Sequence, residues 1–292
     1  MEEGQKSTIR SRELGDELRH AMEVAHLSGK LAARRLGWSE TKVSRLLTGR
    51  QSPIREMDVA SLLTLCDVRG EEKERLVGLA READQHNWLQ HNISSLPEQL
   101  RTLISHENQA SLIYQFDMSR IPGLLQTREY ARALIERAAT ISPDKVESLV
   151  NARIGRQSLF SRDNHPDFMY FIHEVALRVP VGGEVVMSGQ LHQLLRLGVR
   201  RYITIRVIPL EYGAFPVFDN SCRLVEFHQM KPVVYVDQHT AGSFFEDPTT
   251  VAAYRKIFGA LADCSLGEGD SMDAIASLAV DLYGGEDHDG GS

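Results

Sequence analysis

The chain has few cysteines and no long apolar run, and each shortage excludes a class of protein. Its three cysteines, Cys66, Cys222 and Cys264, lie far apart and fit no Cys-x-x-Cys or Cys/His spacing. We therefore expect reduced, structural thiols, and neither a metal site nor a redox pair. The apolar stretch 112–126 is interrupted by polar side chains, and it is shorter than the roughly 18 residues that a membrane-spanning helix needs.

Two further absences narrow the class of protein. Residues 1–12 are polar and charged where a secretory signal would be apolar, so we expect a cytoplasmic protein without a membrane partner. Gly182-Gly183 stands without a Gly-x-Gly-x-x-Gly or Gly-Lys-Ser/Thr pattern, which favours a turn over a phosphate-binding loop. No cofactor is expected.

Charge is distributed unevenly along the sequence. The formal net charge is -7, which is unsuited to coating nucleic acid without selectivity. Between Ser28 and Arg55, however, seven basic residues stand against Glu40 alone, a local charge of +6. From Asp263 to the end there are eight acidic residues and no Lys or Arg. A local basic patch on an acidic chain favours a focused contact with DNA.

The length of 292 residues and a hydrophobic fraction of 42% predict a globular protein of more than one domain. The expected fold class is multidomain: an all-α helix-turn-helix domain of five helices, a helical segment, and an α/β or α+β domain. The expected parts are a DNA-binding domain at 1–85, a helical linker or dimerisation segment at 86–165, a regulatory or partner-binding domain at 166–283 and a disordered tail at 284–292.

Hydrophobic periodicity and capping residues give the expected elements. The five N-terminal helices are expected at 12–24, 30–36, 39–48, 53–65 (with Pro53 in the first turn) and 71–89. The later helices are expected at 97–108, 128–139, 143–160, 188–197, 248–261 and 270–283. The strands are expected at 110–116, 168–173, 204–208, 222–227 and 233–236.

The segment from Gly29 to Gly49 has the spacing of a helix-turn-helix. Such a unit needs a small residue where its helices cross, a glycine at the turn and branched apolar residues inside the second helix. Ala33, Gly37, Val43 and Leu46 occupy these positions. The alternative is a helical bundle with a solvated basic face, since Lys and Arg are usually surface residues.

Helical geometry places the polar residues of the second helix opposite Val43 and Leu46, where they can enter the major groove. The expected base-reading residues are Thr41, Lys42, Ser44 and Arg45. Residues near the helix start and end are suited to phosphate contacts. The expected backbone contacts are Lys30, Ser39, Arg50 and Gln51.

About the first eighty residues resemble the xenobiotic-response-element (XRE) family of helix-turn-helix regulators. The segments that carry this resemblance are Leu14-Gly15-Asp16-Glu17-Leu18-Arg19, Lys30-Leu31-Ala32-Ala33-Arg34-Arg35-Leu36-Gly37, Thr41-Lys42-Val43-Ser44-Arg45-Leu46 and Gly49-Arg50 to Pro53.

The rest is similar to the uncharacterised, antitoxin-like C-terminal domain of many actinobacterial regulators. The matching residues are Ile121-Pro122-Gly123-Leu124-Leu125-Gln126-Thr127, Glu129-Tyr130-Ala131, Arg153, Arg156-Gln157, Glu174, Ala176-Leu177, Gly182-Gly183, Gln190-Leu191 and Val207-Ile208-Pro209. The resemblance implies a developmental or antibiotic-pathway regulator with a small partner protein encoded nearby. Ile154-Gly155 departs from the arginine and small residue usual in that family.

Other residue groups leave alternatives open. An aromatic cluster is a possible pocket for a small-molecule effector or a partner, or ordinary core. Its members are Tyr212, Phe215, Phe218, Phe244 and Phe245. His173-Glu174, and His228 near Lys231, resemble fragments of an acid/base site, but neither has a partner identifiable by spacing. No catalytic residue is therefore assigned.

The leading hypothesis is a homodimeric transcriptional regulator that binds a palindromic operator in double-stranded DNA and receives its signal through the C-terminal domain. The first alternative is an antitoxin-like protein whose C-terminal domain captures a small protein, with DNA binding for autoregulation. The second is an enzyme fused to a DNA-binding domain.

Overall fold

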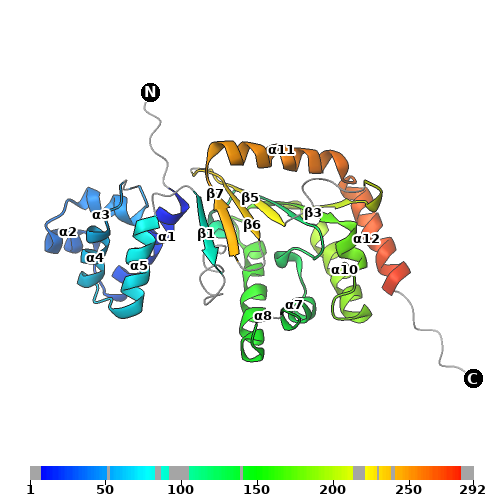
Figure 1. Ribbon diagram of the computed structural model, residues 1–292, viewed down its shortest axis with the longest axis horizontal. Coiled ribbons are helices and arrows are strands. Elements are labelled where there is room, and N and C mark those ends of the chain that lie inside the picture. The colour runs from blue at the N-terminus through cyan, green and yellow to red at the C-terminus, as the bar shows by residue number, and fades with distance from the viewer. Residues whose placement is uncertain are drawn as a thin grey trace, which may run out of the picture.

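The computed structural model describes residues 8–50, 53–82, 87–91, 105–138, 141–212, 221–228, 230–237 and 241–283. Figure 1 shows a group of helices at one end of the molecule and a sheet covered by helices at the other. This arrangement confirms an all-α N-terminal part followed by a mixed α and β part. Within the described residues, no helix combines the length and apolarity needed to cross a membrane.

The N-terminal part contains the five expected helices, packed around one core. They are α1 (Ile9–Val24), α2 (Gly29–Leu36), α3 (Glu40–Leu47), α4 (Glu56–Leu65) and α5 (Gly70–Glu82). Leu14 and Leu18 of α1 meet Leu46 of α3 and Leu62 of α4 in this core. Burial of each such leucine contributes on the order of 2 kcal/mol to stability.

Two expected boundaries in this part are wrong. Arg55 is the N-cap of α4, so Pro53 precedes the helix instead of occupying its first turn. The fifth helix ends at Glu82, whereas a helix to Leu89 was expected, and residues 87–91 instead pair with a distant strand. Strand pairing with a partner far along the chain has no local sequence signal, because hydrophobic periodicity reports only neighbouring residues.

The second part is built on one seven-stranded sheet with the order β1-β7-β6-β5-β2-β3-β4. Its strands are β1 (Asn87–His91), β2 (Leu112–Asp117), β3 (Asp167–His173), β4 (Ile203–Ile208), β5 (Cys222–Glu226), β6 (Val233–Asp237) and β7 (Ala241–Phe245). Strands β2, β3 and β4 are parallel, and the remaining pairs are antiparallel. Strand β2 lies between β3 and β5, so strands from both sides of the expected boundary at residue 165 share one sheet.

Helices cover both faces of the sheet. The helical elements are η1 (Gly123–Leu125), α7 (Arg128–Glu136), η2 (Pro143–Lys145), α8 (Val146–Gly155), η3 (Arg156–Ser161), α9 (Glu174–Arg178), α10 (Glu184–Gly198), η4 (Leu210–Tyr212), α11 (Pro248–Cys264) and α12 (Glu268–Tyr283). Residues 105–109 are also helical. Helix α11 lies on one face, and α7, α8 and α10 lie on the other (Figure 1). The single helix expected at 143–160 is three consecutive pieces.

Candidate nucleic-acid interface

Helix α3 is fixed at its start and along its inner side. Ser39 caps it, because the Ser39 Oγ accepts a hydrogen bond of 3.1 Å from the Lys42 amide, which satisfies one of the free N–H groups of the first turn. Gly37 ends α2 in the left-handed conformation, with φ of 67°, as a glycine allows without steric cost. The side chains of Val43 and Leu46 face inward and are each 1% exposed. The inner face expected from the sequence is therefore the one observed.

The end of α3 is held against α1 by an unusually close approach of the two backbones. A Cβ atom on Gly15 would lie 2.4 Å from the carbonyl oxygen of Leu47, so only glycine fits at this crossing. The Ser11 hydroxyl donates to the carbonyl of Gly49 at 2.9 Å. The Arg19 guanidinium donates to the Leu47 carbonyl at 2.8 Å. The sequence reasoning missed this junction, although the glycine inside an apolar helical pattern was a signal for it.

Three of the four expected base-reading residues point to solvent. Thr41, Ser44 and Arg45 are exposed on α3. The fourth, Lys42, is engaged within the protein: its ammonium lies 2.7 Å from a carboxylate oxygen of Asp58 on α4 and 4.1 Å from the ring centroid of Trp38. These contacts tie the first turn of α3 to α4, so Lys42 positions the helix in the free protein.

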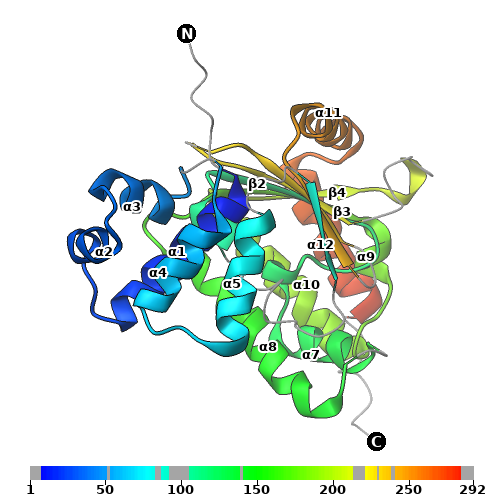
Figure 2. The same cartoon turned by 60° about the vertical axis from the view of Figure 1, so that its left-hand side comes forward.

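Positive charge borders the exposed face of α3. Lys30 at the start of α2 and Arg50 just after α3 are exposed. Burial and the neighbouring charge of Arg50 lower the pKa of Arg12. Figure 2 shows α2 and α3 on the side of the five-helix unit that faces away from the sheet. Of the remaining expected phosphate contacts, Ser39 is exposed but its hydroxyl is engaged as the cap, and Gln51 lies outside the described residues.

The described members of the expected aromatic cluster do not come together. Tyr212 is 55% exposed, whereas Phe244 is fully buried. Phe244 and Phe245 are neighbours on β7 and pack on opposite faces of the sheet, in the two separate cores. Phe215 and Phe218 lie outside the described residues. The described part of this group therefore forms no common pocket.

The candidate acid/base pair on β3 and α9 has structural contacts. The ring of His173 caps α9 by accepting from the Val175 amide at 3.2 Å. The carboxylate of Glu174 accepts from the Leu210 amide at 2.9 Å and from Arg178. In the part of the chain that the structure describes, no group of three or more His, Cys, Asp or Glu residues is arranged to hold a metal ion.

Two family models match the chain. Residues 13–76 match a model described as a helix-turn-helix domain, and residues 100–277 match one described as a domain of unknown function, DUF5753. The first covers most of α1, all of α2 to α4 and the first half of α5, and the second covers most of the sheet part. No curated protein and no solved structure gave a significant match.

Proposed function

Because the chain belongs to the family of the domain of unknown function DUF5753 and carries a helix-turn-helix domain, we propose that it is a transcriptional regulator that reads a specific DNA site with α3. The helix-turn-helix match supports the part of this proposal that concerns DNA binding by a regulator. The observation that supports sequence reading is the division of α3 into a buried apolar face and an exposed face of hydroxyl and guanidinium groups.

The exposed residues of α3 have the chemistry to distinguish bases. The Arg45 guanidinium can donate two hydrogen bonds to O6 and N7 of guanine, the commonest specific contact in the major groove. Thr41 and Ser44 lie on the same exposed surface and can donate to base edges or touch a thymine methyl group. Lys42, bound to Asp58, keeps α3 oriented for these contacts.

Contacts to phosphate complete the proposed interface. Lys30, near the start of α2, and Arg50, just after α3, are exposed, and the free N–H groups at the start of α3 attract a phosphate through the helix dipole. Gln51 extends this set. Neutralised phosphates release counterions, so binding weakens as salt rises, and each contact adds about 0.9 to the slope of log affinity against log salt.

We propose that two chains bind together. One recognition helix reaches about three or four base pairs, which is too few to define a site in a genome with many competing sequences. Two copies related by a two-fold axis would read half-sites about 34 Å apart on a palindrome. The mass of the complex in solution tests this point: one chain per operator duplex contradicts it. A small partner protein stays a prediction from the resemblance.

Selection from random DNA by the full-length protein tests base reading. Arg45→Ala should lose preference at one position of each half-site, because a bidentate contact contributes about 1–3 kcal/mol of discrimination. Lys30→Ala should weaken all sequences alike and lower the salt slope by about 1. Arg69→Ala, which removes an arginine whose side chain is 83% exposed in the α4–α5 connection, is the control. An unchanged selected site with Arg45→Ala would contradict the assignment.

A further inference from the structure

A cavity of about 260 Å³ lies against the sheet face that carries α7 and α8. Its polar floor includes Gln115 of β2, Arg223 of β5 and Tyr235 of β6. These residues are register neighbours, because Gln115 pairs with Arg223 and Arg223 pairs with Tyr235. Side chains at paired positions point to the same face. The strand register thus places a row of polar side chains on a face that is otherwise apolar core.

Four arginines line the cavity, and they are not equally partnered. Glu107 lies between Arg156 and Arg223 and forms ion pairs with both. Arg120 is paired with Asp237 at 2.5 Å and is 3.7 Å from Asp117. Each of these three arginines therefore has at least one carboxylate partner.

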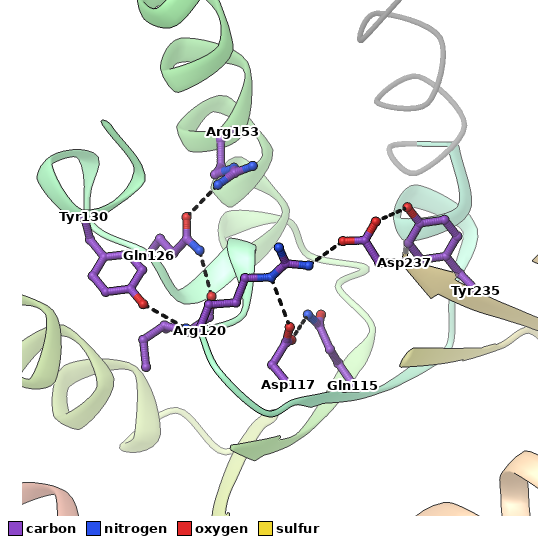
Figure 3. A network of polar contacts seen from close by, with 9 residues as sticks. Gln115, Asp117, Arg120, Gln126, Tyr130, Arg153, Tyr235 and Asp237 are labelled. Atoms are coloured by element: carbon purple, nitrogen blue, oxygen red, sulfur yellow. Dashed lines mark hydrogen bonds and ion pairs between the residues drawn. The ribbon is translucent and has the colours of Figure 1, made fainter. Parts of the chain in front are cut away.

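Arg153 is the fourth arginine, and it has no carboxylate within ion-pair distance among the described residues. Its Nη1 donates to the amide oxygen of Gln126 at 3.0 Å, a contact that Figure 3 shows. Burial, together with the charges of Arg156 and Arg120, lowers the pKa of Arg153 to about 10. The charges of Asp237 and Asp117 act on Arg153 without forming an ion pair with it, and a buried cation without a direct counter-ion favours an incoming anion.

Two other cavity residues carry buried polar atoms without a partner. The Arg223 Nε–H and the Gln115 side-chain oxygen make no hydrogen bond within the described part of the chain. Arg223 is 7% exposed and Gln115 is 6% exposed. Buried polar groups are almost always satisfied, so each unsatisfied one calls for a missing partner. A ligand that both accepts and donates would satisfy this donor and this acceptor.

The opposite wall of the cavity is apolar. It is formed by Leu134 and Ile135 of α7 with Ala138 and Ile141 beyond its end. Ligand sites commonly combine such apolar walls with a few fixed polar groups. The volume of 260 Å³ is just below the roughly 300–1,000 Å³ that ligand pockets occupy, which limits the ligand to a small molecule.

We propose that this cavity binds a small organic anion, with its carboxylate or phosphate on Arg153 and its apolar body against α7. Its role as the effector of the regulator rests on the proposed function. Residues 105–109 connect the cavity to the DNA-binding domain. On the cavity side, Glu107 forms ion pairs with two of the cavity arginines. On the other side, burial and then the charge of Arg10 in α1 lower the pKa of the neighbouring His106.

Isothermal titration calorimetry of the full-length protein without DNA tests the site. The probes are inorganic phosphate, phenyl phosphate, 4-phenylbutyrate and the neutral 4-phenylbutanol. At least one anionic aryl probe should bind with a stoichiometry of one molecule per chain, and more tightly than the alcohol. Comparison of phenyl phosphate with 4-phenylbutyrate shows whether the site prefers a phosphate or a carboxylate. If every anion binds no better than the neutral alcohol, the proposal is wrong.

Two variants locate the bound probe. Arg153→Gln should weaken binding of the anion at least tenfold, because a charge-assisted hydrogen bond is lost. Arg196→Gln, at an exposed position of α10, should not weaken it. Ala138→Phe should block binding by filling the apolar side while leaving every arginine in place. Equal losses in Arg153→Gln and Arg196→Gln, or full binding by Ala138→Phe, would overturn the location.

DNA binding gives a separate readout. A saturating probe should change operator affinity, and an unchanged affinity would overturn the effector role while leaving the anion site intact. If the unmodified protein does not bind DNA at all, the proposed function is wrong. The calorimetric measurement of anion binding would still test the cavity.

Discussion

Lowering the pH should destabilise the protein at His106, which lies where the DNA-binding domain, the cavity and the sheet meet. The His106 side chain is buried, its ring faces the rings of Phe244 and Phe227 at centroid distances of 5.6 and 6.4 Å, and its Nε2 has no partner within the described residues. Burial, followed by the charges of Arg10 and Arg223, lowers the pKa of His106 to about 3. The folded protein therefore keeps this imidazole neutral.

The size of the effect follows from proton linkage. The unfolded chain binds a proton at His106 below its ordinary pKa of 6.5, whereas the folded protein does so only near 3. The stability that depends on the neutral ring is complete above pH 6.5 and is lost as the pH falls toward 3. The free energy of unfolding should fall by about 1.4 kcal/mol per pH unit in this window, or about 2 kcal/mol by pH 5.

Urea unfolding followed by far-UV circular dichroism at about pH 7.5 and pH 5 measures this loss. Carboxylates also titrate, so the informative quantity is the difference between proteins. His106→Gln should lose about 2 kcal/mol less than the parent protein over this interval. His192→Gln, which removes an exposed histidine of α10, controls for the loss of any imidazole. Equal pH dependence in His106→Gln and the parent protein would refute the reasoning.

Two substitutions, each compared with a control substitution, test other parts of the structure by urea unfolding. Gly15→Ala should cost about 1–3 kcal/mol by overpacking and weaken operator binding, because its methyl group would meet the Leu47 carbonyl. Gly78→Ala, with no atom near the new Cβ, should instead stabilise α5, and equal effects would contradict the close approach. Glu107→Gln should cost about 3–5 kcal/mol, because two buried guanidinium groups lose their carboxylate. Glu147→Gln breaks only exposed pairs and should cost less than about 1 kcal/mol. Similar losses would contradict the buried network.

Local signals predicted α3 and its exposed face, because cap, turn and core residues are all encoded within about twenty positions. Ser39 caps the helix, Gly37 ends the preceding one, and Val43 lies inside, as expected. The role of Lys42 was not predictable from helical geometry. Its position places it beside the base-reading face, and only the fold brings Asp58 of α4 to its ammonium group.

The cavity could not be predicted from the sequence, for a related reason. Arg153 and Arg156 belong to the segment that carries the C-terminal resemblance, but a pair of helical arginines is usually a solvated surface. The burial of Arg156 depends on Glu107, which lies 49 positions earlier and also pairs with Arg223 on β5. The edge strand β1 was missed because its pairing with β7, too, joins distant segments.

Stability alone gives no reason for the charges around the cavity. Removing an arginine and a carboxylate from water costs several kcal/mol each, and well-packed apolar residues of the same volume often stabilise a protein more. Glu107 with Arg156 and Arg223 nevertheless lies against the main core of the sheet. Within the described residues, Arg153 has no carboxylate at ion-pair distance, and its guanidinium donates to the Gln126 amide oxygen. The energetic cost of this buried network supports the proposal that the cavity binds an anion.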